Sequence, residues 1–175
     1  TLIVSDDLIV ELDETFSVVP FTYAHDDCGR NDDGSSVEMA LEFSFEFYGD
    51  VHSSLYINNN GNLSFGADFS TYSSTGFPVE NFPMIAPFWA DVDTREPGGV
   101  VYYRSEANRF VVTWDHVGHY GAYGMDLSNT FQVILTDGTD PLIGLGNNVC
   151  FSYGDMQWTT GDDAVAGLSQ EARRQ

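Results

Sequence analysis

The chain contains no lysine, and its basic residues are arginines alone. Lys+Arg total 6 against 27 Asp+Glu, so the formal net charge is −21. Nucleic acids and anionic membrane surfaces are bound through basic side chains that neutralise phosphates, and this charge excludes both as partners. The absence of lysine also excludes Schiff-base chemistry and the phosphate-binding lysine of a P-loop.

Long apolar runs are missing too. The sequence has no run of about 18 or more apolar residues, so we expect no membrane insertion. The first residues, Thr1 to Asp6, include neither a methionine nor a basic segment, and we expect a mature or trimmed chain, consistent with a removed signal peptide. Disorder is disfavoured because 42% of the residues are hydrophobic and 14% are aromatic. The sequence predicts a folded acidic domain.

Cysteine is scarce. Cys28 and Cys150 lie too far apart in the sequence for a CxxC redox or zinc motif. Two interpretations stay open, namely free, partly buried thiols or one disulfide. In a secreted protein, a disulfide that closes so long a loop would add about 4–5 kcal/mol of stability on the chain-entropy account. We favour the disulfide because features described below point outside the cell.

The clearest pattern that is present is the alternation over residues 37–48. The odd positions are apolar throughout, whereas Glu38, Glu42 and Glu46 occupy even positions. Such alternation is typical of a β-strand with one buried face and one solvent-exposed face. We therefore expect a long strand whose outer face carries part of the negative charge.

Turn residues divide the rest of the chain into further strands. Asn60-Gly61 separates 54–58 from 62–66 and indicates a hairpin with a type I′ turn, which needs positive φ at both central residues. A loop rich in Ser, Thr, Gly and Pro follows at 67–83. The remaining segments are a buried one at 84–90, a hairpin of 100–104 with 109–114, strands at 129–136 and 149–153, and one or two edge strands within 2–12.

No segment has the pattern of an ordinary helix. Short strands with regular turn residues predict an all-β fold, either an antiparallel β-sandwich or a sandwich-like barrel with long loops. We see no internal repeat and no linker.

Six blocks occur in an order that resembles the NIDO domain, a nidogen-like extracellular domain. They are RNDDGS at 30–35, NNNGNLSFG at 58–66, IAPFWADVDTR at 85–95, VVTWDHVG at 111–118, NTFQVIL at 129–135 and QWTTGD at 157–162. The resemblance covers about 25–170, and its texture is closest to bacterial exported versions. It implies a non-catalytic domain of matrix, adhesion or surface-coat proteins, and it does not imply a ligand. We expect a single domain over 1–175, with 1–24 as an edge strand or assembly arm.

Acidic and amide side chains on two loops form a candidate Ca²⁺ site, because Ca²⁺ takes six to eight hard oxygen ligands. The alternative is a solvated loop in which Asx turns cap the chain's own backbone. At the second loop, Arg95 could take the place of the ion. The candidate ligands are Asp26, Asp27, Asn31, Asp32, Asp33, Asp91 and Asp93.

Catalytic chemistry has weaker support. A glycosidase needs two carboxylates about 5–10 Å apart across a sugar, and such a pair could be drawn from Glu80, Asp91, Asp93 and Asp115 beside Trp89 and Trp114. Among 27 acidic residues some pair will always look suitable, so we expect no enzyme. The four histidines, His25, His52, His116 and His119, are expected at the surface.

Aromatic residues beside glycines suggest a binding surface at Trp114, Tyr120 and Tyr123, because exposed aromatic faces suit sugars and proteins. The alternative is that they close one end of the sandwich.

We therefore expect a secreted or cell-surface protein that works through a protein partner or through self-association, as a homo-oligomer or polymer. The alternative is a Ca²⁺-dependent, lectin-like module that binds glycans. In either case the charge predicts that stability or assembly rises with Ca²⁺ or salt.

Overall fold

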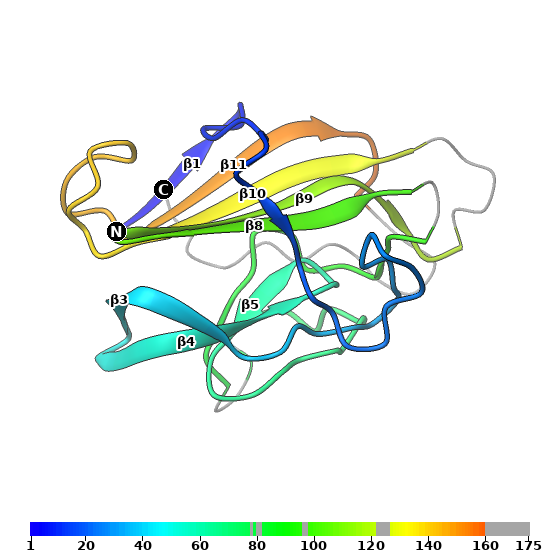
Figure 1. The fold of residues 1–175 in the computed structure, drawn as a ribbon, viewed down its shortest axis with the longest axis horizontal. Coiled ribbons are helices and arrows are strands. Elements are labelled where there is room, and N and C mark those ends of the chain that lie inside the picture. Colours follow the sequence, from blue (N-terminus) through cyan, green and yellow to red (C-terminus); the bar gives the residue numbers. More distant parts are fainter. Residues whose placement is uncertain (78, 80–81, 96–97, 122–126, 160–175) are drawn as a thin grey trace.

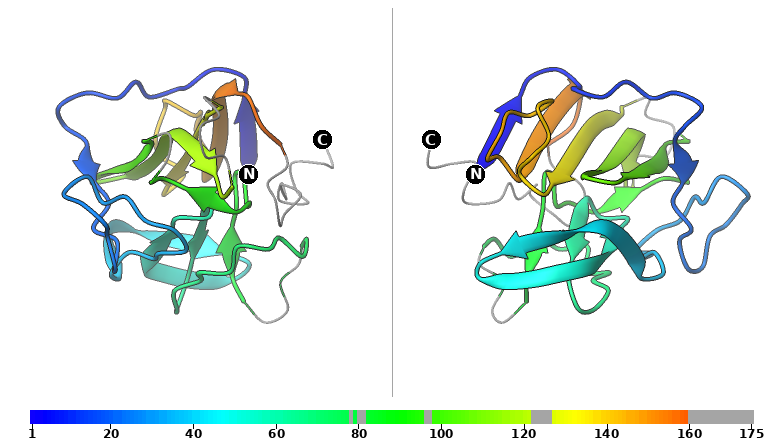
Figure 2. Two further views of the ribbon diagram at one scale, coloured as in Figure 1. Left: turned by 90° about the vertical axis from the view of Figure 1, so that its right-hand side faces the viewer. Right: turned by 60° about the vertical axis from the view of Figure 1, so that its left-hand side comes forward.

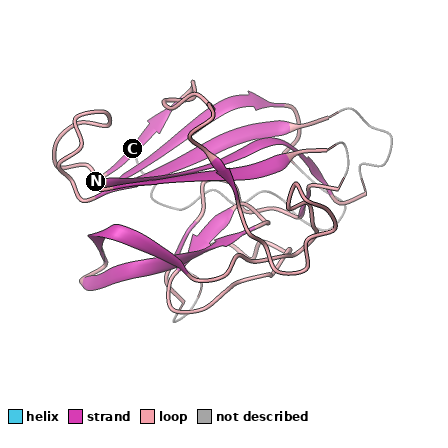
Figure 3. Cartoon of the chain, viewed as in Figure 1, coloured by secondary structure: helices cyan, strands magenta, loops and turns pink. Residues whose placement is uncertain are grey.

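The computed structural model describes residues 1–77, 79, 82–95, 98–121 and 127–159. Within these ranges every regular element is a β-strand (Figure 3), and no helix long and apolar enough to cross a membrane occurs there. The strands are β1 (Leu2–Ser5), β2 (Ser17–Val18), β3 (Met39–Phe47), β4 (Asp50–Asn58), β5 (Asn62–Ser64), β6 (Met84–Ile85), β7 (Val92–Asp93), β8 (Val100–Glu106), β9 (Arg109–His119), β10 (Asn129–Thr136) and β11 (Val149–Met156).

The strands form two sheets that lie one above the other (Figure 1). The larger sheet has the order β1-β11-β10-β9-β8-β2, with β7 paired to β9, and the smaller sheet has the order β3-β4-β5-β6. The sheets do not close into a barrel, so the sandwich prediction is confirmed and the barrel is not formed. One pair departs from the antiparallel expectation, since β1 runs parallel to β11.

The main core lies between the sheets. The alternation of β3 places Leu41 and Phe45 in this core and leaves Glu42 and Glu46 exposed, as predicted. The larger sheet contributes buried aromatic and aliphatic side chains, which include Val101, Phe110, Val112, Trp114, Phe131, Val133 and Phe151.

The N-terminal segment covers the opposite face of the larger sheet (Figure 2). Val10 packs there against Val111 and Ile134 in a second apolar cluster. The Gln132 side chain makes two hydrogen bonds to the backbone of Val10. Its Oε1 accepts from the Val10 N–H at 3.2 Å, and its Nε2 donates to the Val10 carbonyl at 2.9 Å. Strands β9 and β10 are therefore buried on both faces.

The predicted disulfide is not formed. Cys150 is buried in the second cluster on β11, whereas Cys28 is exposed, and both are free. Gly29, next to Cys28, approaches Val18 of β2. Strands β10, β9 and β8 lie between β11, which carries Cys150, and β2, near Cys28. Neighbouring strands are about 4.8 Å apart, so the two cysteines lie well beyond the limit of about 7 Å between Cα atoms that a disulfide allows. The disulfide prediction is wrong for this reason, and the free-thiol interpretation describes the structure.

Candidate functional site

Three segments that are distant in sequence meet beside the β4–β5 hairpin. An isolated bridge pairs Asp32 with Asp93, and another pairs Ser35 with Asn58. The backbone N–H of Asn59 donates to Gly34 O at 2.8 Å. The acid-rich loop 31–36 is therefore held between β7 and the hairpin turn.

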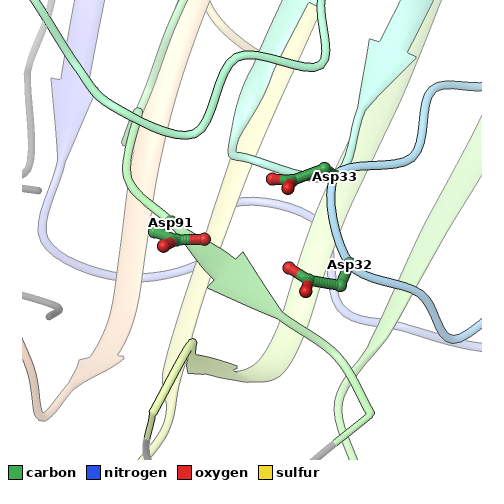
Figure 4. Close-up of side chains that lie close together, drawn as sticks. All are labelled: Asp32, Asp33 and Asp91. Atoms are coloured by element: carbon green, nitrogen blue, oxygen red, sulfur yellow. The ribbon is translucent and has the colours of Figure 1, made fainter. Parts of the chain in front are cut away.

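This arrangement brings Asp32, Asp33 and Asp91 together, and we call the three residues the acidic centre. Their carboxylate oxygens lie within 4.8 Å of one another, and Figure 4 shows the three side chains pointing into the space between them. Asp33 has a left-handed backbone, with φ 56°, a conformation that Asp tolerates better than most residues. Asn60 Nδ2 donates to Asp33 Oδ1 at 2.7 Å and fixes that side chain.

Arg95 is the cation that contacts this group. Its Nη2 lies 2.7 Å from Asp32 Oδ2 and 2.6 Å from Asp93 Oδ2, and its Nε donates to Asp93 Oδ1 at 2.8 Å. Both oxygens of Asp93 are thus engaged by Arg95, the side chain that the sequence offers as the alternative to an ion at this loop. Burial raises the pKa of Asp32 to about 6, and the charges of Asp33 and Asp93 act in the same direction against Arg95.

Two buried oxygens, one in the acidic centre and one on a residue beside it, have no hydrogen-bond partner among the described residues, namely Asp32 Oδ1 and Asn59 Oδ1. Asn59 is fully buried. Its Nδ2 donates to Val92 O and, at 3.4 Å, to Asn31 O. Val92 follows Asp91, and Asn31 precedes Asp32. The Asn59 amide group therefore lies between the two chain segments that supply the carboxylates of Asp32 and Asp91.

The remaining predicted ligands serve the loop itself. Asp26 accepts hydrogen bonds from the backbone of Cys28 and Arg30 and pairs with the Arg30 side chain at 3.2 Å. Asn31 Oδ1 accepts from Gly34 N at 2.9 Å. Asp27 is exposed. The structure therefore brings together three of the seven predicted ligands and leaves these others outside the acidic centre.

The predicted aromatic surface needs correction. Trp114 is fully buried in the main core, where it stacks on Phe131 at 5.0 Å between ring centroids. Position 114 shares the inward parity of Phe110 and Val112 on β9, so it cannot present a binding face. Tyr120 is 39% exposed, and Tyr123 lies outside the described residues.

The histidine prediction holds only in part. His25 and His116 are exposed, whereas His119 is buried against the ring of Trp158. His52 is half-buried, with its ring 4.4 Å from that of Phe65. Of the proposed glycosidase residues, Trp89 is buried and Glu80 lies outside the described part of the chain.

One exposed feature went unrecognised in the sequence, the turn between β3 and β4. Phe47 pairs with Asp50, so Tyr48 and Gly49 form a two-residue turn with φ of 51° and 91°, the signs that a type I′ turn requires. Tyr48 is 78% exposed and Val51 is 68% exposed. We call Tyr48 and Val51 the hairpin tip. The available signal was Gly49 between two alternating runs.

Comparison with known proteins gives the chain a family. The family described as NIDO related matches residues 10–174. The chain belongs to this family. Alpha-tectorin from Gallus gallus is 31% identical to it over 182 residues, which cover 87% of the chain and 8% of the tectorin. Nidogen from Drosophila melanogaster is 31% identical over 165 residues, 78% of the chain and 12% of the nidogen. Nidogen-2 from Mus musculus is 33% identical over 140 residues, 61% of the chain and 10% of that protein.

This NIDO-related chain therefore spans about a tenth of the curated relatives it matches. No solved structure matches it significantly. The relatives that it matches are tectorins and nidogens, in agreement with the extracellular, non-catalytic domain that the sequence predicts. The resemblance seen in the six sequence blocks is confirmed.

Proposed function

We propose that this NIDO-related domain is a structural or adhesive module that binds other proteins in the extracellular matrix or at a cell surface, and that it does so through the hairpin tip. The observation that carries the proposal is a pair of exposed apolar side chains at one hairpin turn, namely Tyr48, which is 78% exposed on a left-handed residue, and Val51, which is 68% exposed. Tyrosine is among the residue types that dominate protein interfaces.

The backbone at Tyr48 makes this exposure costly. A residue with a Cβ pays about 1–2 kcal/mol in the left-handed region, and Asn, Asp and Gly are the usual choices in a type I′ turn. Stability alone would therefore favour asparagine at this position. Residues that keep such strain are concentrated at functional sites.

The surroundings of the hairpin tip indicate the chemistry of its partner. Val51 adds a second exposed apolar side chain, and Glu46, its cross-strand neighbour, and Asp50 are exposed acids beside it. An apolar centre with an acidic rim suits a protein surface that carries an apolar patch edged by Arg or Lys. A second copy of this chain would bring another −21 charges, and self-association would need screening by salt or bound cations.

The carbohydrate-binding alternative has lost part of its basis. It depended on Trp114 as a surface aromatic, and Trp114 is buried in the core. Glycan binding is therefore an outcome that the experiment distinguishes from protein binding.

A matched pair of variants tests the proposal. Tyr48→Asn removes the exposed ring and suits the turn. Tyr23→Asn is the control, because Tyr23 is also left-handed, with φ 64°, and is 92% exposed in a different loop. Binding of the labelled domain is measured on matrix deposited by cultured cells, with and without prior deglycosylation, and self-association is measured by sedimentation velocity at physiological salt.

Wild type should bind or self-associate in a way that survives deglycosylation. Tyr48→Asn should weaken this by about tenfold or more, the effect of losing an interface anchor, whereas Tyr23→Asn should not. A wild-type domain that stays monomeric and does not bind the matrix, binding that needs the glycans, or equal behaviour of the two variants would overturn the proposal.

A further inference from the structure

Asn59, beside the acidic centre, has an amide oxygen that the protein itself leaves unused. Asn59 is fully buried, yet its Oδ1 meets no donor among the described residues. A buried carbonyl that makes no hydrogen bond destabilises the fold unless a ligand or water satisfies it. The Asn59 amide nitrogen donates to carbonyls on either side of the acidic centre, at Asn31 and Val92. Its oxygen therefore belongs to the same group that bridges loop 31–36 and β7.

A second unused oxygen lies in the acidic centre. Asp32 uses Oδ2 for Arg95 at 2.7 Å, whereas its buried Oδ1 has no partner in the described chain. Figure 4 shows the Asp32 carboxylate directed toward Asp33 and Asp91. Two unpartnered oxygens beside three converging carboxylates form an incomplete polar site, and a cation would complete it.

We infer that the acidic centre binds one Ca²⁺, with Asp32, Asp33 and Asp91 as carboxylate ligands and Asn59 Oδ1 as an amide ligand (Figure 4). The donors are all hard oxygens, the type that Ca²⁺ and Mg²⁺ select, and no His or Cys belongs to the cluster. Water would supply the rest of a shell of six to eight ligands.

The arrangement of the ligands favours Ca²⁺ over Mg²⁺. Ligands on opposite sides of a Ca²⁺ lie about 4.6–5.2 Å apart, since each bond is about 2.3–2.6 Å, whereas around Mg²⁺ the same span is about 4.0–4.2 Å. The carboxylate oxygens of the acidic centre lie within 4.8 Å of one another. This spacing is compatible with a Ca²⁺ shell. A set of three carboxylates and one amide from separate segments suits the flexible coordination of Ca²⁺ better than the near-ideal octahedron that Mg²⁺ demands.

The charge balance supports the same ion. Asp32, Asp33, Asp91 and Asp93 gather beside the guanidinium of Arg95, and His25 adds only a smaller positive influence at Asp32. A divalent cation offsets repulsion among these carboxylates that Arg95 leaves uncompensated. Because the ligands come from loop 31–36, the hairpin turn and the segment before β7, the ion would fasten three parts of the chain that are far apart in sequence.

The experiment compares thermal unfolding and calorimetric titration of the whole chain with CaCl₂, MgCl₂, and NaCl at matched ionic strength. We expect CaCl₂ at about 100 times the dissociation constant to raise the melting temperature by about 5–10 °C. Asp33→Asn should abolish Ca²⁺ binding, and it suits the left-handed backbone at φ 56°. Asp27→Asn, an exposed acid of the preceding loop, should bind Ca²⁺ as the wild type does.

A measurement on the wild type makes the test independent of how the variants fold. On addition of Ca²⁺, the amide NMR signals of Asp32, Asp33, Asn59 and Asp91 should shift more than that of Asp27. An equal thermal effect of matched NaCl would overturn the inference, because it would mean charge screening alone. So would Ca²⁺ binding that survives Asp33→Asn, an equal response to Mg²⁺, or absence of the NMR shifts.

Discussion

The indole Nε1 of Trp114 donates a hydrogen bond of 3.1 Å to the backbone carbonyl of Asn59. Trp114 belongs to β9 of the larger sheet, and Asn59 begins the turn that ends β4 of the smaller sheet. The contact therefore joins the two layers of the sandwich at the residue whose side chain bridges loop 31–36 and β7. Core packing and the geometry of the acidic centre depend on the same turn.

Replacement of Trp114 by phenylalanine tests this connection. Trp114→Phe keeps an aromatic ring against Phe131 but removes the donor and leaves the buried carbonyl of Asn59 without it. We expect the free energy of unfolding to fall by about 1–3 kcal/mol, the usual cost of an unsatisfied buried acceptor. Urea denaturation followed by circular dichroism measures this loss. A change below about 0.5 kcal/mol, the range of ordinary surface substitutions, would show that the hydrogen bond does not join the layers.

Gly61 closes the same turn, and its substitution should be severe. Gly61 has φ 78°, and a Cβ there would lie 1.8 Å from Phe88 O. Left-handed strain and overpacking each cost about 1–3 kcal/mol, so Gly61→Ala should lose about 3–5 kcal/mol. Gly66→Ala is the matched control, since Gly66 has φ 85° with nothing within 4 Å of the added Cβ. It should lose only the strain, and equal losses in urea denaturation would contradict the close approach.

The hairpin tip yields a stability prediction of opposite sign. Because Asn tolerates the left-handed backbone better than Tyr, Tyr48→Asn should raise the free energy of unfolding by about 1 kcal/mol. Tyr48 also contacts the ring of Phe47, at 4.6 Å between centroids, and loss of that contact offsets part of the gain. A net destabilisation in urea would mean that this ring contact, and not function, accounts for Tyr48.

The two thiols should react very differently. Burial raises the pKa of Cys150 to about 11, so this thiol stays protonated and enclosed at pH 8, whereas Cys28 is exposed. Ellman's reagent should therefore modify one thiol of the native protein at once and both after denaturation in guanidinium. Cys28→Ser should remove the fast reaction. Rapid modification of two thiols, or of none before reduction, would contradict the structure.

Local patterns in the sequence predicted most of the fold. The alternation at 37–48 identified β3 and its buried face, because a two-residue period has one structural meaning. Asn60-Gly61 correctly predicted the hairpin, but the predicted type I′ turn is wrong. Gly61 has positive φ and Asn60 does not, since a third residue, Asn59, belongs to the loop and favours a type I turn closed by a left-handed glycine.

The acidic centre could not be predicted from local sequence patterns, because it depends on tertiary packing. Asp32 and Asp91 were recognised as candidate ligands, but their meeting depends on how loop 31–36 packs between β7 and the hairpin. Asn59 was not among the candidate ligands because an asparagine beside Asn-Gly is already explained by a turn. Trp114 was predicted at the surface because of the glycine-rich segment that follows it. Its alternation with Phe110 and Val112, which places all three on the same face of β9, was the better indicator.

Site-specific photocrosslinking tests most directly whether the hairpin tip touches a partner protein. The photoreactive p-benzoylphenylalanine is placed at position 48 in one sample and at position 23 in another, and each is irradiated on deposited matrix and alone in solution. Both positions are exposed, with 78% and 92% of the residue accessible, so unspecific capture should be equal. We predict a discrete crosslinked protein band from position 48 and none from position 23. The same bands from both positions, or no band from position 48, would contradict the account.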